Sequence, residues 1–104
     1  MRSKRSYGEE PTVVPEGKNN IHLQMLFNMH FALYHNAKTG EEKKHYLRNV
    51  EVISKEMMTR SMDERFSIYA DIKDKIEKAA SDGEYEDAEL LKEMGKYYYE
   101  NVLM

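Results

Sequence analysis

The chain has 104 residues, of which 40% are hydrophobic and 34% charged, and its formal net charge is −3. This length and composition are typical of one globular domain and exclude a disordered or a membrane-embedded chain. It contains no cysteine, which rules out disulfides and thiolate metal sites and favours a cytoplasmic location. No apolar run approaches the ~20 residues that span a bilayer, and no apolar segment follows the basic start "MRSKRS", so we expect neither membrane insertion nor a secretory signal.

The first 18 residues contain both prolines and two of the five glycines, and they show no sustained periodicity. Such a segment cannot bury enough apolar surface to order itself. We therefore predict a flexible N-terminal arm over residues 1–18 and a single helical domain over residues 19–104.

The next segment, residues 20–37, predicts a helix that Asn19 or Asn20 can cap. Gly40 suits a left-handed residue after its end. Residues 19–37 carry no formal charge, and apolar side chains occupy nearly every side of the helix. A helix of this kind lies centrally or is shared between chains, and in so small a domain part of its surface is expected to need a partner.

Residues 41–81 contain neither glycine nor proline and predict amphipathic helix throughout. The sequence "SMDE" at 61–64 fits a capping box, which indicates a break near Arg60–Met62, although one long helix with a shift of phase remains open. The predicted core positions follow two phases: Tyr46, Val50, Ile53 and Met57, then Met58, Met62, Phe66, Tyr69, Ile72 and Ile76.

A turn is predicted at residues 81–85, where Gly83 can adopt a positive φ. The last helix begins around Glu84–Glu86, where acidic residues favour a helix N-terminus, and reaches about Leu103. The predicted fold is therefore all-α: a small bundle of three or four helices with a C-terminal hairpin over about residues 62–103.

Within this hairpin, residues 76–94 carry an alanine pair, a short turn, an acidic–aromatic–acidic triplet and a later alanine before "LKE". The stretch resembles the UVR motif, a helical hairpin of excision-repair nuclease subunits and Clp-type chaperone components. It departs from that pattern at Gly83, where the family has leucine, at Glu89, where it favours alanine, and near Gly95, where it favours an aliphatic residue. The resemblance covers about a fifth of the chain and implies protein–protein docking or self-pairing rather than chemistry. The matching residues are Ala79, Ala80, Glu84, Tyr85, Glu86, Ala88, Leu91, Lys92 and Glu93.

Residues with catalytic or metal-binding chemistry do not converge in the sequence. The four histidines lack the i, i+4 spacing of paired ligands, and the single Glu-x-x-His unit at Glu42–His45 lacks the second unit that a di-metal bundle needs. His30 is expected to be a core histidine bonded to a neighbour. The glycines are scattered and form no phosphate-binding loop. We expect no enzyme, no metal and no cofactor.

A basic stripe is the feature that favours nucleic acid. On the second predicted helix, Lys44, Arg48 and Lys55 share one side, interrupted by Glu51, and the arm adds Arg2, Lys4 and Arg5. Residues 61–104, in contrast, carry six basic and twelve acidic side chains. This acidic half favours basic partners and repels nucleic acid.

The chain ends in three consecutive tyrosines followed by "ENVLM". Adjacent helical residues point about 100° apart, so the three cannot all face one core. Tyr98 continues a predicted core stripe, and at least one of its neighbours should be exposed. Tyrosine and methionine are common in interfaces, and the predicted protein-binding residues are Tyr85, Tyr97, Tyr99, Leu103 and Met104.

Together these features favour a non-enzymatic helical adaptor that contacts a larger machine of transcription, replication or repair, or proteolysis. Its expected partner is a protein with a basic or apolar docking surface, or a second copy of the chain. Two alternatives remain: a small nucleic-acid-associated protein, and a structural subunit of a virion or other assembly.

Overall fold

The computed structural model describes residues 17–104, so most of the predicted arm lies outside the described residues. Within this range four α-helices follow one another: α1 (Asn20–His35), α2 (Gly40–Met57), α3 (Met62–Ser81) and α4 (Tyr85–Tyr98). One turn of π-helix, η2 (Tyr99–Leu103), continues α4. The predicted all-α bundle with a C-terminal hairpin is confirmed, and residues 41–81 form two helices rather than one.

Side chains at the helix starts explain where the helices begin. Asn19 accepts from the backbone N–H of His22, and Thr39 accepts from that of Glu42. At α3, Ser61 and Glu64 form the predicted capping box, which satisfies donors that the first helical turn leaves without partners.

Gly40 is not the left-handed residue after α1, so that prediction was wrong. The first helix ends earlier, at His35, and Gly40 is the first residue of α2, directly after its cap Thr39. Gly83 does have a positive φ, of 79°, as predicted. It allows the backbone N–H of Glu84 to reach the carbonyl of Ala79, which closes α3 before α4 begins.

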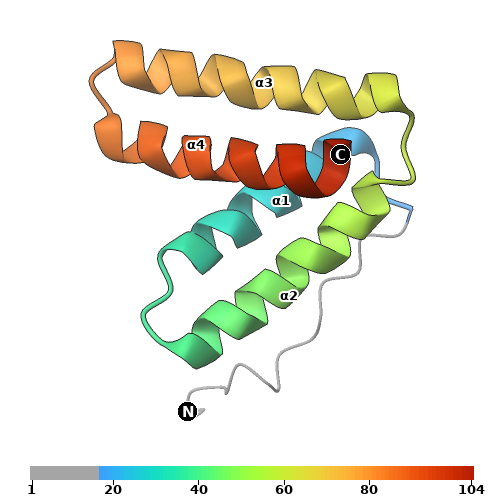
Figure 1. The fold of residues 1–104 in the computed structure, drawn as a ribbon, viewed down its shortest axis with the longest axis horizontal. Helices are drawn as coiled ribbons and strands as arrows, with labels where there is room; N and C mark the ends of the chain where they lie inside the picture. The colour runs from blue at the N-terminus through green and yellow to red at the C-terminus, as the bar shows by residue number, and fades with distance from the viewer. Residues whose placement is uncertain (1–16) are drawn as a thin grey trace.

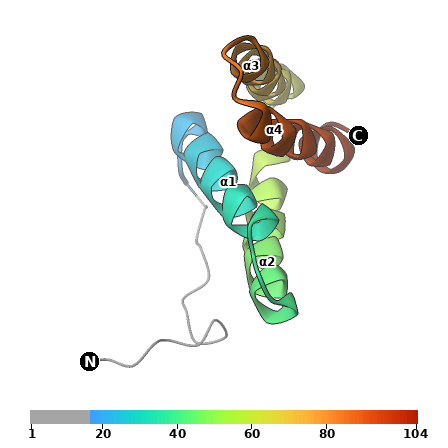
Figure 2. The same cartoon turned by 90° about the vertical axis from the view of Figure 1, so that its left-hand side faces the viewer.

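The four helices form two antiparallel hairpins, α1–α2 and α3–α4, which lie across each other (Figure 1). Turned by 90°, the molecule shows α4 between α3 and the first hairpin (Figure 2). The end of α4 contacts α1, and η2 contacts α2. The two hairpins therefore share one core where they cross, and the end of α4 lies within this core.

That core is aromatic at its centre. Phe27 and Tyr98 are fully buried and meet edge to face with ring centroids 5.7 Å apart. The hydroxyl of Tyr98 donates to the backbone carbonyl of Arg65 at 2.8 Å, which joins α4 to α3. The other members of the core are Leu23, Phe31, Val50, Ile53, Met57, Ile68, Ile72, Met94 and Val102.

The second phase of the predicted stripe, which runs from Met58 at the end of α2 into α3, coincides only partly with the core. Met58, Met62 and Phe66 are 46%, 44% and 50% exposed, whereas Ile68, which the predicted stripe omitted, is buried. Phe66 lies about 120° around the helix from Ile72, at 100° per residue. The hairpin turns Ile68 and Ile72 inward, and Phe66 is left on the flank.

Candidate protein-docking surfaces

The three consecutive tyrosines divide between the core and the surface. Tyr98 is in the core, as predicted. Tyr97, predicted to bind protein, is half-buried, with its ring 5.7 Å from that of Phe31 and 6.2 Å from that of Phe27. Burial raises the pKa of Tyr97 and that of Tyr98 above the ordinary tyrosine value. Tyr99 is 46% exposed.

Tyr99 lies beside α3 and is part of a larger apolar surface. Its ring centroid is 5.7 Å from that of Tyr69, and Phe66 and Met62 precede Tyr69 on the same flank of α3. We call Met62, Phe66, Tyr69 and Tyr99 the tail surface. Sequence reasoning assigned Phe66 and Met62 to the core. Their spacing alone could not separate the flank from the core face.

The other predicted docking residues are dispersed. Leu103 is half-buried against the core, and Met104 is 78% exposed. Tyr85 is 72% exposed at the opposite end of α4, about 20 Å from Tyr99 at 1.5 Å per residue. The structure therefore does not bring Tyr85 together with the tail surface.

Backbone and side-chain contacts hold the tail surface in place. Arg65 on α3 donates from Nη1 to the carbonyl of Val102 at 2.8 Å, and the backbone N–H of Met104 donates to the carbonyl of Tyr99 at 3.0 Å. Val102 is fully buried. The exposed Tyr99 thus lies between two buried residues, Tyr98 and Val102, and its position is fixed before any partner arrives.

A second apolar surface runs along the outer side of α1. Ile21, Met25, Met29 and Leu33 are 70%, 62%, 51% and 39% exposed. We call these four residues the α1 stripe. They lie opposite the buried face of α1, which confirms that part of this helix is left uncovered by the other described residues.

Hydrogen bonds fix the orientation of α1. Arg60 donates to the Asn20 side chain and to the carbonyl of Lys18, while Gln24 donates to Asp71 of α3. The amide of Gln24 is the main cause that lowers the pKa of Asp71 below its usual value. These bonds fix which side of α1 faces outward.

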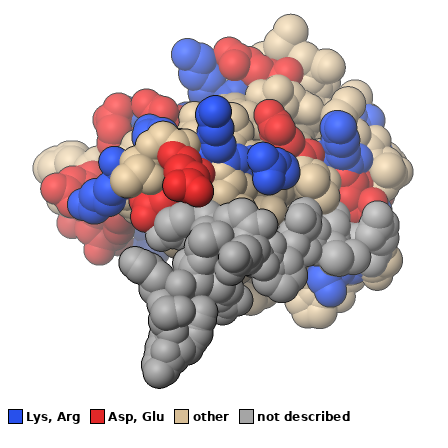
Figure 3. Space-filling view, turned by 90° about the horizontal axis from the view of Figure 1, so that it is seen from below, with Lys and Arg blue, Asp and Glu red and all other residues tan. Residues whose placement is uncertain are grey.

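The basic stripe is exposed on α2 at Lys44, Arg48 and Lys55, with Glu51 exposed between them. Arg2, Lys4 and Arg5 lie outside the described residues. On the face of the molecule that points downward in Figure 1, basic and acidic side chains are interspersed (Figure 3). That face offers no extended single-sign patch for phosphates where its residues are described.

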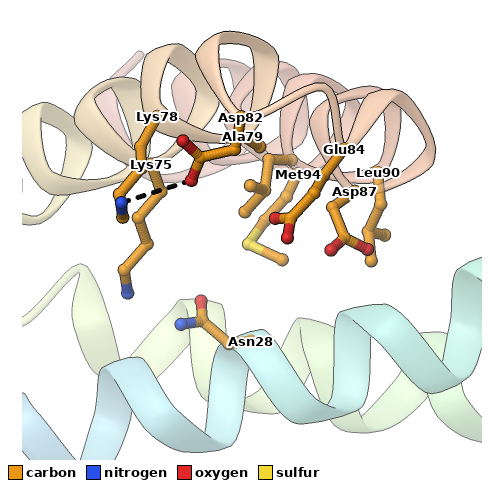
Figure 4. A pocket seen from close by; sticks show the side chains of 10 residues that line it. Asn28, Lys75, Lys78, Ala79, Asp82, Glu84, Asp87, Leu90 and Met94 are labelled. Atoms are coloured by element: carbon orange, nitrogen blue, oxygen red, sulfur yellow. Dashed lines mark hydrogen bonds and ion pairs between the residues drawn. The ribbon is translucent and has the colours of Figure 1, made fainter.

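A groove of about 350 Å³ lies between α1 and the closed end of the α3–α4 hairpin (Figure 4). Asn28 reaches into it from α1, and its Oδ1 is buried without a hydrogen-bond partner. Lys75 and Lys78 lie at one rim, where Lys78 pairs with Asp82 at 3.2 Å, and Glu84 and Asp87 lie at the other (Figure 4). The lining contains no hydroxyl or thiol side chain. The lining residues are Asn28, Lys75, Lys78, Ala79, Asp82, Glu84, Asp87, Leu90, Leu91 and Met94.

Among the described residues 17–104, no group of three or more His, Asp or Glu side chains is arranged to hold a metal. His45 of the Glu-x-x-His unit is 7% exposed and packs edge to face on Tyr46. His30 is half-buried and is not a member of the core, so the expected core position was wrong, but its Nδ1 does lie 3.4 Å from the amide nitrogen of a neighbour, Asn49.

At the closed end of the α3–α4 hairpin, Ala79 and Ala88 are buried, with exposed fractions of 5% and 4%. Their small side chains let the two helices approach closely. Ala80 is exposed, and the exposed Tyr85 does not cover the pair.

No helix within residues 17–104 has both the length and the apolar character needed to cross a bilayer. Comparison with known protein families, curated proteins and solved structures found no significant match to any of them. The likeness to the UVR hairpin remains a prediction that rests on its own residues.

Proposed function

We propose that this protein is a non-enzymatic cytoplasmic adaptor that acts by docking on another protein, part of a larger machine of transcription, replication or repair, or proteolysis. The observation that carries the proposal is the tail surface, where Phe66 and Tyr99 are each about half exposed although the core fixes their backbone. Large aromatic side chains held in place lose little conformational entropy when a partner covers them. Exposed aromatics on a rigid support are therefore suited to anchor an interface.

Charge supports a partner of a particular kind. Residues 61–104, which include α3 and α4, carry a net charge of −6, from six basic and twelve acidic side chains. A partner that places an apolar pocket within a basic surface would fit both properties. The basic surface would speed the encounter, and the pocket would supply most of the affinity.

The proposal is tested by capture from cell extract on the immobilised full chain, comparing Phe66→Ser and Tyr99→Ser with wild type. Tyr85→Ser is the matched control, because Tyr85 is exposed on the same hairpin but far from the tail surface. We expect one partner, identified by mass spectrometry, that wild type and the control retain and the two tail variants lose. With the purified partner, each tail variant should weaken binding at least tenfold.

A chain shortened at Lys96 is a poor substitute for these variants, because it removes the core residues Tyr98 and Val102. If wild type, the control and both tail variants capture the same proteins equally, the tail surface does not dock a partner. Binding that does not weaken with added salt would argue against a basic partner surface.

A further inference from the structure

The α1 stripe has a regular geometry. Ile21, Met25, Met29 and Leu33 are each four residues apart, so every step turns the side chain by only about 40° around the helix. Side chains at this spacing form one continuous ridge, the kind that interlocks with a like ridge on another helix. The ridge lies opposite the buried face formed by Leu23, Phe27 and Phe31, so it takes no part in the core of its own chain.

We propose that the α1 stripe binds the α1 stripe of a second copy of this chain, in an antiparallel contact with two-fold symmetry. A two-fold contact uses the same patch on both copies, which requires the patch to be self-complementary. The stripe meets this requirement about its midpoint. Ile21 would face Leu33 of the second copy, and Met25 would face Met29 of the second copy.

Charge selects a second copy as the occupant. Residues 61–104 carry a net charge of −6, so a contact between two copies through α3 and α4 brings like charges together. Residues 19–37, which contain all of α1, carry no formal charge. The α1 stripe can therefore meet itself without ionic repulsion, whereas a partner recognised by charge would find nothing on α1 to pair with.

The geometry also sets the shape and strength of the contact. Two ridges of four-residue spacing pack with their helix axes crossing at about −50°. The contact is one helix wide, which places it near the small end of specific interfaces, about 1,200 Å² in total. Methionines at its centre can adapt to each other's shape. We expect a reversible dimer with a Kd on the order of 10–100 μM.

This inference does not depend on the proposed adaptor function, because the tail surface and the α1 stripe share no residue. If both hold, the dimer presents two tail surfaces to its partner. Two linked surfaces bind a divalent target more tightly than either surface alone.

The test is sedimentation equilibrium of the full chain from about 1 μM to 1 mM, a range that brackets the expected Kd. The apparent mass should rise from 12.3 kDa toward twice that value. Met25→Lys and Met29→Glu should each remain monomeric, because each places an unpaired charge against a methionine. Met58→Lys, at an exposed methionine outside both the α1 stripe and the tail surface, is the control and should still dimerise.

Mixing Met25→Lys with Met29→Glu should restore a dimer, because the antiparallel arrangement pairs the introduced lysine with the introduced glutamate and leaves the other Met–Met contact intact. Circular dichroism of each variant checks that the helices are retained. Recovery only when Met25→Lys is mixed with Met25→Glu would overturn the antiparallel register. A full chain that stays monomeric throughout would overturn the proposal, as would dimerisation that appears only after residues 1–16 are removed.

Discussion

The hydroxyl of Tyr98 is buried, so we predict that it makes the protein less stable at alkaline pH. Replacing Tyr98 by phenylalanine should remove this contribution. Tyr98→Phe keeps the ring but removes the hydrogen bond to the carbonyl of Arg65. A neutral hydrogen bond of this kind contributes about 1 kcal/mol to the free energy of unfolding. At pH 7 the variant should therefore be less stable than wild type by about 1 kcal/mol.

Above pH 10 the difference should shrink, because burial raises the pKa of Tyr98 in the folded protein well above its ordinary value. The unfolded chain ionises Tyr98 near pH 10 while the folded chain does not, so rising pH favours unfolding. By pH 11 this effect has cost wild type about 1.4 kcal/mol that the phenylalanine variant does not lose. The two stability curves should therefore meet near pH 11.

Urea unfolding followed by circular dichroism at pH 7, 9, 10 and 11 measures both effects. All other tyrosines and lysines are common to the two proteins, so their titration cancels in the difference. Tyr99→Phe is the control, because it removes a tyrosine hydroxyl from the exposed surface and leaves the hydrogen bond of Tyr98 in place. A difference between Tyr98→Phe and wild type that stays constant from pH 7 to 11 would refute the reasoning.

Two further predictions concern glycine and carboxylate positions. Gly95→Ala should raise the free energy of unfolding by about 0.5–1 kcal/mol, because alanine favours the helix and its Cβ would lie 3.4 Å from Ile72 Cγ2, an ordinary van der Waals contact. Gly83→Ala should instead lower the free energy of unfolding by about 1 kcal/mol, because φ at Gly83 is +79°. Thermal unfolding of both variants checks this pair, and equal effects of the same sign would contradict it. Asp71→Asn should destabilise the protein at neutral pH and matter less in acid, because the bond from Gln24 lowers the pKa of Asp71 and its stabilisation is lost as pH falls through that lowered value. Urea unfolding at pH 7 and pH 3 measures the change, and an equal loss at both would contradict it.

Local signals predicted the helix boundaries well, because caps and turns depend on a few neighbouring residues. The capping box at Ser61 and the left-handed Gly83 are of this kind. The prediction for Gly40 failed because a single glycine suits either the position after one helix or the first position of the next helix. Gly40 takes the second position because the side chain of the preceding residue, Thr39, caps α2.

The candidate docking residues were harder to predict, because their exposure depends on how the hairpins cross. Tyr98 was predicted in the core from the periodicity of its own helix. Tyr97 is half-buried because Phe27 and Phe31 of α1 lie against it. The periodicity of α4 alone cannot predict a contact with another helix. Phe66 sits in a periodic pattern as regular as that of Ile68, and only the crossing of the hairpins turns one outward and the other inward.

The passage of α4 and η2 through the shared core has a consequence for folding during synthesis. Each hairpin joins sequence neighbours and can form soon after its residues leave the ribosome. Phe27 lacks its buried neighbour Tyr98 until 71 further residues have been made. The apolar inner face of the first hairpin therefore stays open until the end of α4 has been made. A chaperone can reach this face during that period, whereas the end of α4 and η2 cover it in the finished chain.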